Sequence, residues 1–488
     1  MRPRTSVSLW RFCFFLVFVC AAPWAWAADE AALARLTAEV EAHGQQMKYL
    51  SLLADEIGSR LTGSPGARRA AEVMEAEMKR LGLENVHREP FSVPVSWQRG
   101  AATATLVSNG GRPLAVASYT WAPGTASAVE GEIVDIGAGR PEDIQGAGSR
   151  LKGNIALVTL PSGSLDDVIG GFYRTPLLAR DLRDAGAAAL LLSSDKQHAM
   201  LYTAPVEFNA RLAALPTLSV AKEDAGLLRR LAANGLAPRA RPRVRIDVRN
   251  TVGPSFESTN VVGEIRGRER PEEIVVLGAH LDSNDLGPGA LDNAAGSAGV
   301  MEVARAIRAL GLAPRRTIRF VLFTGEEEGM LGSNAYVRRH RDEMGRTVAA
   351  FIMDIGAGRP MGWYSMGRTD LDTEIHELMA RLKEFGLSAI EHASFAATDN
   401  AAFMAEGVPN LVMIQDESDY LPVHHTIADT PDKAERKDYA SAVAVLAATT
   451  YAVADGPRRF GRRLTPEEVK RMAAETKVDA QWRAAGIW

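Results

Sequence analysis

The sequence has almost no cysteine: Cys13 and Cys20 are the only two in 488 residues. Both lie in the first 27 residues, so removal of that segment leaves a chain without a thiol. Such a chain has neither disulfide bonds nor thiolate metal ligands. Its stability then depends on an apolar core, and a metal site in it has to use histidine nitrogens and carboxylate oxygens.

Long apolar runs are also scarce. After a basic start, an apolar run from Phe12 to Ala22 leads to residues 25–27 (Ala-Trp-Ala), a small-residue cleavage pattern. This arrangement predicts a signal peptide over residues 1–27 and export to the periplasm or the medium. The run is too short to span a membrane and no stretch of about 18 apolar residues follows it. We therefore expect no membrane association after cleavage. Lipid attachment at Cys20 is the alternative, which the two bulky residues before it disfavour.

The sequence lacks an excess of basic charge. Its formal net charge is −4, and removal of residues 1–27, which hold three arginines and no acids, changes it to −7. A chain without a basic field does not attract polyanions, so we expect no nucleic-acid partner. With 46% hydrophobic and 24% charged residues, the composition is that of a folded globular protein rather than a disordered chain.

The pattern of residues divides the rest of the chain. Single cores rarely grow beyond about 250–300 residues, so a chain of this length predicts two domains or one domain with an insertion. Residues 28–100 have helical periodicity and form the first part of the main domain. Residues 101–250 contain short β-type runs separated by glycine and proline, with one helix candidate from Pro176 to Ala185. They predict a separate β-rich insertion.

Residues 251–455 alternate between strand and helix patterns. This alternation predicts an α/β fold with a mostly parallel central sheet that helices cover on both faces. Residues 456–488 are polar, and Thr465-Pro466-Glu467-Glu468 combines an N-cap, a proline at the first helical position and a glutamate at the third. This motif predicts a short exposed C-terminal helix.

Chemically active side chains follow the ends of the predicted parallel strands. One strand runs into His280, the next ends shortly before Glu326 and Glu327, and a third ends at Asp354. Functional groups in open parallel sheets collect at the carboxyl ends of the strands. We therefore expect these four side chains to lie close together.

Other residues extend this set. Asp292 stands in a loop of small residues, where a carboxylate can approach closely enough to bridge two metal ions. His425, with His424 before it, lies in a loop well downstream. Asp282 follows His280 by two positions and can hydrogen-bond the second imidazole nitrogen, which fixes the tautomer of a metal-binding histidine.

Each residue alone has an ordinary interpretation. His280 can be a loop histidine, the acids 326–328 a solvated turn, and Asp354 a helix cap. Three successive strands that each end in a histidine or a carboxylate, followed by a paired-histidine loop, rarely arise by chance. Adjacent acids also repel one another unless a cation compensates them. Together these features predict a metal site, with zinc favoured by the ligand types and Co²⁺ or Mn²⁺ possible.

An ordered set of motifs supports this interpretation. In chain order the motifs are His280-Leu281-Asp282-Ser283, Gly289-Ala290-Leu291-Asp292, Gly325-Glu326-Glu327, Met353-Asp354-Ile355-Gly356, Thr398-Asp399, Gly407-Val408-Pro409 and His424-His425-Thr426. The set resembles the cocatalytic zinc aminopeptidase family, and most closely its carboxypeptidase Q (plasma glutamate carboxypeptidase-like) branch, over about residues 45–455. The spacing of 12 residues from His280 to Asp292 is also similar to that branch.

The resemblance implies an activity and a site. It implies a two-zinc exopeptidase that cleaves dipeptides or other small peptides, with Glu326 as the general base. It further implies that residues 101–250 are an inserted protease-associated domain and that the protein is a homodimer. The metal ligands that it implies are His280 and Asp354 for one zinc, Glu327 and His425 for the other, and Asp292 as the bridge.

Alternative functions stay open at this point. The wider family removes N-terminal residues from longer peptides, so an aminopeptidase is the first alternative. Relatives of this fold can also be binding proteins that have lost their ligands, although here every ligand position is filled. Acyl transfer, as in glutaminyl cyclases, is less favoured, because a scaffold that holds one zinc does not need all five of the ligand residues present here. The sequence departs from the branch at Asn284 and in residues 328–331, both near the predicted substrate pocket.

Overall fold

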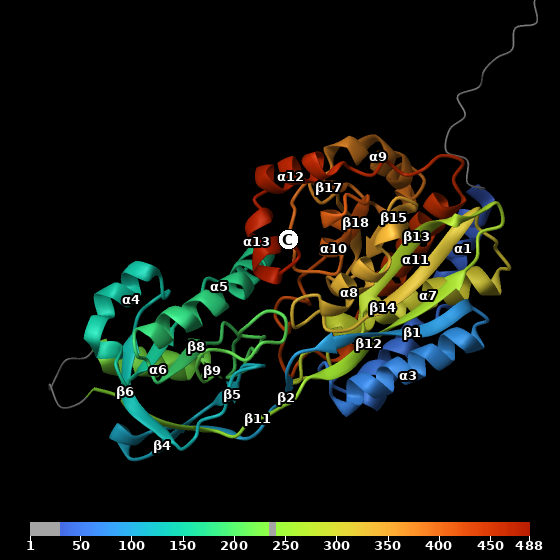
Figure 1. The fold of residues 1–488 in the computed structure, drawn as a ribbon. Coiled ribbons are helices and arrows are strands. Elements are labelled where there is room, and N and C mark those ends of the chain that lie inside the picture. Colours follow the sequence, from blue (N-terminus) through green and yellow to red (C-terminus); the bar gives the residue numbers. More distant parts are fainter. Residues whose placement is uncertain (1–29, 234–240) are drawn as a thin grey trace, which may run out of the picture.

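The computed structural model describes residues 30–233 and 241–488 (Figure 1). The predicted signal peptide, residues 1–27, lies outside this described part. Two sheets organise the chain into two lobes, which Figure 1 shows side by side, the larger on the right. Among the described residues, no helix has both the length and the apolar character that crossing a membrane requires.

The large lobe is built on one mixed sheet. Its strands are β1 (Glu84–Val93), β12 (Phe256–Ile265), β13 (Arg270–His280), β14 (Arg316–Phe323), β15 (Thr347–Ile352), β16 (Pro360–Tyr364), β17 (Ala389–Glu391) and β18 (Asn410–Gln415). Their order is β1-β12-β14-β13-β15-β18-β16-β17. The four strands in the middle, β14, β13, β15 and β18, are parallel. The predicted α/β class with a mostly parallel central sheet is confirmed.

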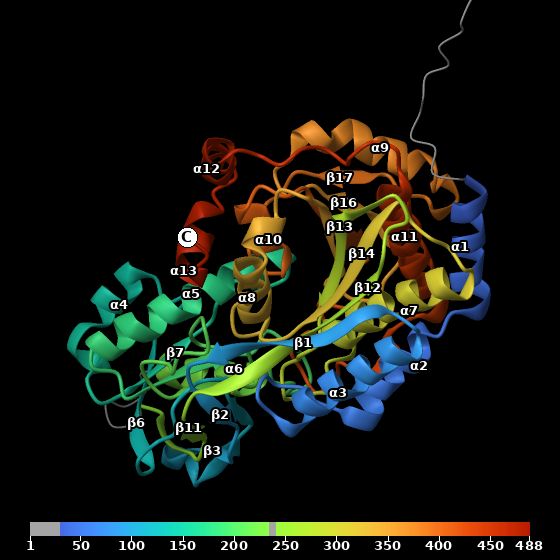
Figure 2. The ribbon, with the colours of Figure 1, turned by 45° about the vertical axis from the view of Figure 1, so that its right-hand side comes forward.

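Helices cover both faces of this sheet (Figure 2). On one face lie α7 (Ala295–Ala309) and α11 (Arg436–Asp455), with α1 (Glu30–His43) and α2 (Gln46–Ser51) packed on them. On the other face lie α8 (Leu331–Arg339) and α10 (Asn400–Ala405). The remaining helices of this part of the chain are α3 (Pro65–Arg80), beside β1 and β12, and α9 (Asp372–Ala380).

The core of the large lobe sits between the central strands and α7. Every residue of β14 and β15 is buried, as expected for parallel strands with helices on both faces. The apolar stripe of α7, which includes Val300, Val303 and Ile307, is fully buried against them. Burial of each such side chain contributes about 1.5–3 kcal/mol, so this packing holds the strand ends in a fixed register.

The small lobe is built on the second sheet. Its strands are β3 (Ala102–Leu106), β4 (Arg112–Leu114), β5 (Val116–Ser118), β6 (Val129–Asp135), β7 (Ile155–Val158), β8 (Ala189–Ser193), β9 (Thr217–Val220) and β10 (Arg243–Val248). Their order is β4-β3-β10-β6-β7-β8-β9-β5, with β6 to β9 parallel. Three helices accompany them: α4 (Pro141–Ala147), α5 (Leu165–Asp184) and α6 (Lys222–Ala233). The assignment of this lobe to the protease-associated domains stays a prediction.

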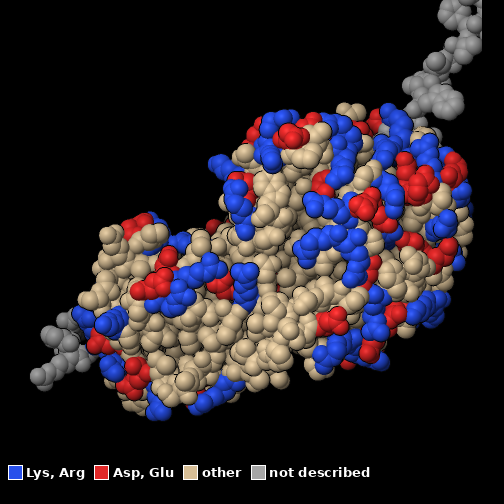
Figure 3. Space-filling view, viewed as in Figure 1, with Lys and Arg blue, Asp and Glu red and all other residues tan. Residues whose placement is uncertain are grey.

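A short ribbon joins the lobes. It pairs β2 (Ser96–Gln98) with β11 (Thr251–Gly253), so the chain enters and leaves the small lobe at one place. On the face seen in Figure 3, acidic and basic side chains are interspersed over the large lobe. A largely uncharged surface crosses the junction with the small lobe on that face.

Helix α5 differs from the prediction. We expected a helix from Pro176 to Ala185, whereas α5 begins at Leu165 and contains Pro176 in its interior. Its first half includes Gly170 and Gly171, and glycine lowers intrinsic helix propensity by about 1 kcal/mol per residue. Packing against the large lobe and an N-cap at Ser164, whose hydroxyl accepts from the amide of Asp167, stabilise this half instead.

The C-terminal segment is also less exposed than predicted. Helix α12 (Pro466–Glu475) begins at the expected capping box, with Thr465 and Glu468 as its two members. However, α12 and α13 (Asp479–Ala485) pack on the large lobe. Val469 on α12 and Trp482 on α13 are buried in the same core as the central sheet. The sequence pattern did not indicate this packing because polar residues dominate the exposed faces.

Candidate metal centre

The predicted site residues meet at the carboxyl edge of the large sheet. Strand β13 ends at His280, and the parallel register of β14 and β15 aligns their carboxyl ends with it. The segments that leave these strands carry Glu326, Glu327 and Asp354. All four side chains are buried or nearly so, and the apolar sheet beneath them leaves little freedom to move.

Asp292 lies at the centre of this group. Its Oδ1 is 3.1 Å from Nε2 of His280, which is itself 2.9 Å from Oδ1 of Asp354. Its Oδ2 is 3.1 Å from Nε2 of His425, which is 2.9 Å from Oε2 of Glu327. The five predicted ligand residues therefore form two histidine–carboxylate pairs, and the two oxygens of Asp292 are divided between them.

These distances suit zinc. Ligand atoms at about 2.0–2.1 Å from one tetrahedral ion lie about 3.3 Å apart, close to the separations observed here. The donors are imidazole nitrogen and carboxylate oxygen, and the described residues contain two groups of three such donors that share Asp292. One group adds His280 and Asp354 to it, and the other adds His424 and His425, whereas Glu327 joins the site through its 2.9 Å contact with His425. The arrangement fits a pair of cations that share one carboxylate.

The pKa values of the buried acids and histidines also favour a bound cation. Burial raises the pKa of Asp354 to about 6. Burial lowers the pKa of His425, but Glu327 and Asp292 outweigh it and raise that pKa to about 10. Without an ion, the buried acids and histidines therefore share protons among themselves. A divalent cation replaces those protons and compensates the acids.

Asp282 occupies a different position from the one predicted. The hydrogen-bond partner of His280 Nδ1 is the backbone oxygen of Asp282, at 3.1 Å, whereas its carboxylate lies 3.6 Å away. That carboxylate accepts from the hydroxyl of Thr62 at 3.0 Å. It also accepts, over longer contacts, from the backbone amides of Glu326 and Glu327. Asp282 thus contacts both the histidine and the acidic pair.

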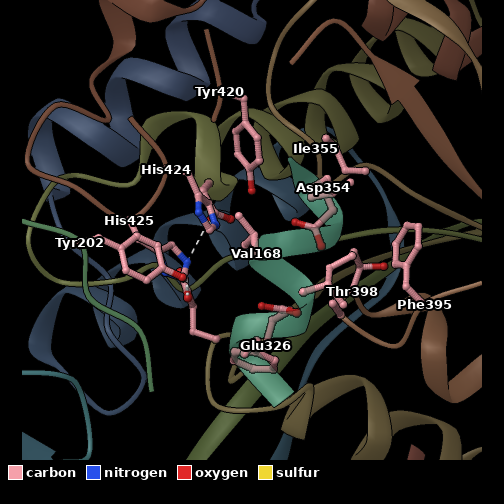
Figure 4. Close-up of a pocket in the computed structure, with 16 residues that line it drawn as sticks. Val168, Tyr202, Glu326, Asp354, Ile355, Phe395, Thr398, Tyr420, His424 and His425 are labelled. Atoms are coloured by element: carbon pink, nitrogen blue, oxygen red, sulfur yellow. Dashed lines mark ion pairs between the residues drawn. The ribbon is translucent and has the colours of Figure 1, made fainter. Parts of the chain in front are cut away.

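Glu326 lies beside the ligand groups but belongs to neither of them. It lines the same pocket as Asp354 and His425, and Figure 4 shows its carboxylate directed into that pocket. Burial raises the pKa of Glu326 well above its usual value, and the nearby Asp354 and Asp399 raise it further, against the opposing effect of His280. A carboxylate in such a place is suited to accept a proton.

Comparison with known proteins identifies the family. Residues 260–450 match the model of peptidase family M28. The chain is 30% identical over 423 residues to carboxypeptidase Q of Bos taurus, across 86% of this chain and 87% of that protein. The chain belongs to peptidase family M28. The predicted enzyme class, a metallopeptidase, and the predicted resemblance to carboxypeptidase Q are therefore confirmed.

Solved structures agree with this M28 assignment. The crystal structure of a peptidase M28 precursor from Shewanella amazonensis has a TM-score of 0.81 and 28% identity, covering 89% of this chain and 99% of that one. BSAP, a zinc aminopeptidase from Bacillus subtilis, shares the fold with a TM-score of 0.65 at 21% identity, covering 83% of this chain and 94% of that one. The relatives are exopeptidases of both kinds, carboxypeptidase and aminopeptidase.

His424 is a residue of this M28 peptidase to which the sequence analysis gave no role. Its Nε2 lies 3.1 Å from Oδ2 of Asp292, the same oxygen that His425 contacts. The two imidazole rings stack with centroids 3.8 Å apart. Only His425 also reaches Glu327. The pair of adjacent histidines was the available signal, but sequence alone does not say which ring faces which acid.

Two further missed residues hold the loop that carries Asp292. Arg60 is fully buried, and its guanidinium donates to the backbone oxygens of Leu281, Pro288 and Gly289 at 2.6–2.8 Å. The carboxylate of Asp429 accepts from the backbone amides of Leu291, at 2.6 Å, and Asp292, at 3.1 Å. These contacts join distant segments, so no local pattern in the sequence signals them.

The small lobe also reaches the site of the peptidase. The ring of Tyr202 stacks on His425 with centroids 5.4 Å apart. The side chain of Asn284 bonds to Thr203 of the small lobe, and the backbone amide of Asn284 donates to Glu327 at 2.7 Å. Asn284, where the sequence departs from the carboxypeptidase Q branch, therefore links the two lobes.

Two buried carboxyl groups stand behind the ligands. Glu328, the third acid of the triplet, is fully buried, and burial and Asp282 raise its pKa well above the usual value. Its backbone oxygen accepts from the amide of Asn209 in the small lobe. Burial raises the pKa of Asp399 to about 8. For both groups burial favours the neutral acid, and buried Glu328 differs from the solvated turn that is the ordinary interpretation of the triplet.

Proposed function

We propose that this M28 peptidase is an exported exopeptidase that holds two zinc ions and hydrolyses dipeptides or other small peptides. The observation that carries the proposal is the division of the Asp292 oxygens between two histidine–carboxylate pairs. One carboxylate shared in this way serves two cations rather than one. Co²⁺ or Mn²⁺ are the alternative metals, because their ligand preferences overlap with those of zinc.

The proposed ligands follow from the distances. His280 and Asp354 would hold one ion, and His425 and Glu327 the other, with Asp292 between them. When bound, zinc supplies Lewis acidity, which polarises a carbonyl and makes water acidic enough to act as a nucleophile near neutral pH.

Glu326 performs the proton transfers in the proposed reaction. Its carboxylate removes the proton of the attacking water and then delivers it to the leaving amine of the peptide. Burial favours this role, because a raised pKa lets one carboxyl group act first as a base and then as an acid. Arg60 and Asp429 keep the loop of Asp292 in place during these steps.

The pocket supports short substrates. Helix α5 of the small lobe crosses in front of the metal ligands and lines the same pocket (Figure 4). In the proposed mode of binding, a long peptide chain has to pass this helix, whereas a dipeptide does not. The second candidate is an aminopeptidase that trims longer peptides, favoured by the shared fold with BSAP.

A matched set of peptides separates these functions. The mature protein, from Ala28, is assayed with a free dipeptide, its N-blocked and C-amidated forms, and a free pentapeptide, each with and without chelator. We expect chelator-sensitive cleavage of the free dipeptide and little cleavage of the others. Stepwise removal of N-terminal residues from the pentapeptide moves the assignment to aminopeptidase.

Zinc content completes the test. Two zinc ions per chain, measured by elemental analysis, support the proposed site, whereas one ion points to a scaffold of the glutaminyl cyclase type. Bound zinc without cleavage of any peptide points to a binding protein and contradicts the exopeptidase proposal.

Export and assembly are part of the proposal. We propose cleavage after Ala27, which N-terminal sequencing of the exported protein tests, with Ala28 as the expected first residue. We also propose a homodimer, which sedimentation analysis tests. A monomeric mass at micromolar concentration contradicts the dimer, and an intact N-terminus contradicts the signal peptide.

A further inference from the structure

Helix α5 divides its apolar residues between the two lobes. The first half presents Leu165, Val168, Ile169 and Phe172, spaced i, i+3, i+4 and i+7 along one face. A stripe with this spacing normally faces the core of the helix's own domain. Here it lies outside the core of the small lobe: all four residues line the pocket that holds the metal-ligand residues.

The second half of the same helix behaves in the usual way. Leu178, Ala179 and Leu182 are buried in the core of the small lobe. Ile169, by contrast, belongs to the core of the large lobe, and Leu165 packs against that core. The residues of α5 before Pro176 thus extend over the large lobe, and those after it pack within the small lobe. Figure 1 shows α5 reaching from one lobe to the other.

Specific contacts hold this first half in place. The hydroxyl of Tyr173 donates to the backbone oxygen of Ala396 in the large lobe. The ring of Phe172 meets Phe208 edge to face, with centroids 4.8 Å apart. Next to it, the amide of Asn209 donates at 2.7 Å to the backbone oxygen of Glu328. The stripe is therefore a fixed wall of the pocket rather than a loosely packed segment.

The composition of this pocket is divided. Its polar lining includes the acids and histidines, among them Asp354 and Glu326. Its apolar lining includes the stripe of α5 together with Phe395 and Ile355. None of the α5 side chains in the pocket is charged, so a charged substrate side chain placed against them loses its hydration and finds no partner. An apolar side chain gains from burial there.

We propose that Leu165, Val168, Ile169 and Phe172 of α5 form the specificity wall of the enzyme. The wall receives the side chain of a substrate residue next to the scissile bond and selects large apolar residues. The small lobe thereby determines which peptides are cleaved, although the reaction takes place on the large lobe. This inference rests on the proposed peptidase function, and its test separates the two.

The activity test uses two variants of the wall and one control on the same helix. Dipeptides X-Ala and Ala-X, with leucine or alanine at X, give the ratio of kcat/KM for leucine over alanine. We expect Phe172→Ala to lower this ratio about tenfold in one series, because apolar contacts of one or two methylene groups change specificity by that order. Val168→Phe should lower it by filling the space. Leu177→Ala, at a side chain 58% exposed on the same helix, should leave it unchanged.

A binding test makes the inference independent of turnover. The zinc-loaded protein is titrated with leucine hydroxamate and glycine hydroxamate, and the ratio of the two Kd values is compared between wild type and Phe172→Ala. A ratio that falls about tenfold in the variant supports the wall even if the wild type cleaves no dipeptide, an outcome that contradicts only the proposed function. The inference is overturned if the kcat/KM ratio stays at the wild-type value in both wall variants and the Kd ratio stays there in Phe172→Ala.

Discussion

Glu326 and Glu327 are neighbours in sequence with different surroundings. One oxygen of Glu327 lies 2.9 Å from His425 and the other accepts from the amide of Asn284. Glu326 has no histidine at such a distance among the described residues and faces the open pocket. In the proposed reaction, adjacent positions after β14 therefore have two different roles, metal binding for Glu327 and proton transfer for Glu326.

The first prediction follows from this difference. Glu326→Gln should lower kcat by about 10²–10⁴-fold, because the amide cannot accept the proton of water. Zinc content should stay near the wild-type value, since Glu327 and not Glu326 contacts a proposed ligand histidine. Kinetics and elemental analysis of the same preparation check this. Equal loss of metal and activity would show that the roles of Glu326 and Glu327 are exchanged.

The two stacked histidines provide the second prediction. His425 lies within ion-pair distance of both Asp292 and Glu327, whereas of these two acids His424 reaches Asp292 alone. We expect His425→Ala to lose one zinc ion per chain and His424→Ala to retain both, with activity reduced in each. Zinc stoichiometry after dialysis distinguishes them. The reverse pattern assigns the ligand role to His424.

At the scale of elements, Arg60 joins the segment before α3 to the loop between β13 and α7. Its donors satisfy backbone oxygens of that loop, which is otherwise irregular and buried. Burial lowers the pKa of Arg60 to about 10, and nearby Asp429 and Asp282 counteract this effect, so the side chain stays charged at neutral pH. A single buried cation thus fixes the loop that carries Asp292.

We therefore predict that Arg60→Met weakens zinc binding about 10–100-fold, the usual effect of removing a group that orients metal ligands. A competition titration with a chromogenic chelator measures it. Arg69→Met is the matched control, because Arg69 lies on α3 with its side chain 66% exposed and should have no effect. Wild-type zinc affinity in Arg60→Met contradicts the proposed role of the loop contacts.

Glu89 joins β1 to the end of α8. Its carboxylate is 4% exposed and lies 2.8 Å from Nε2 of His340 and 3.1 Å from Nε2 of His87. Burial acts to raise the pKa of Glu89, but His340, His87 and Arg339 together outweigh it and the net shift is downward. A lowered pKa means that this carboxylate stabilises the fold above its unfolded pKa of about 4.3 and stops doing so as the pH falls through the folded value.

Glu89→Gln should therefore lower the free energy of unfolding by about 1–3 kcal/mol at pH 7. The difference from wild type should shrink as the pH falls below the unfolded pKa of about 4.3 and disappear below the lowered pKa of folded Glu89. Denaturant titrations at several pH values measure it, with exposed Glu84→Gln on the same strand as the control. A difference that does not depend on pH attributes the effect to packing instead of charge.

At the scale of the whole molecule, the chain contains separate apolar cores. One fills the large lobe around the central sheet, and two others lie on the faces of the small-lobe sheet. A fourth, smaller core combines Phe91 and Val93 of the large lobe with Trp121 and Ala210 of the small lobe. The proposed metal ligands all belong to the large lobe, whereas the wall of the pocket comes from the small lobe. Metal binding and substrate selection are thus assigned to different folding units.

This division predicts two unfolding transitions by calorimetry, of which only one responds to zinc. Zinc at 100 times its Kd should stabilise the large lobe by about 2.7 kcal/mol, and a chelator should remove that stabilisation. The transition of the small lobe should stay in place. A single transition that moves as a whole with zinc would show that the α5 contacts make the two lobes unfold together.

The sequence was sufficient to predict the α/β class and which residues meet at the sheet edge. Both depend on short-range patterns: buried apolar strands, the helical stripe of α7, and polar residues placed directly after strand ends. Because parallel strands align their carboxyl ends, His280, the acidic pair after β14 and Asp354 had to come together once the sheet formed. Family motifs added the assignment of Asp292 and His425.

Only the tertiary structure decided what surrounds these ligands. Arg60, Asp429 and the first half of α5 act across 100 residues or more of chain, and their local sequence is unremarkable or, with Gly170 and Gly171, unfavourable for the structure that they adopt. Periodicity and motifs indicate the structure that a segment forms with residues close to it in the sequence. Packing between distant segments determines which stripe of a helix lines a pocket in the other lobe. The energy of that packing is gained only when both lobes are folded.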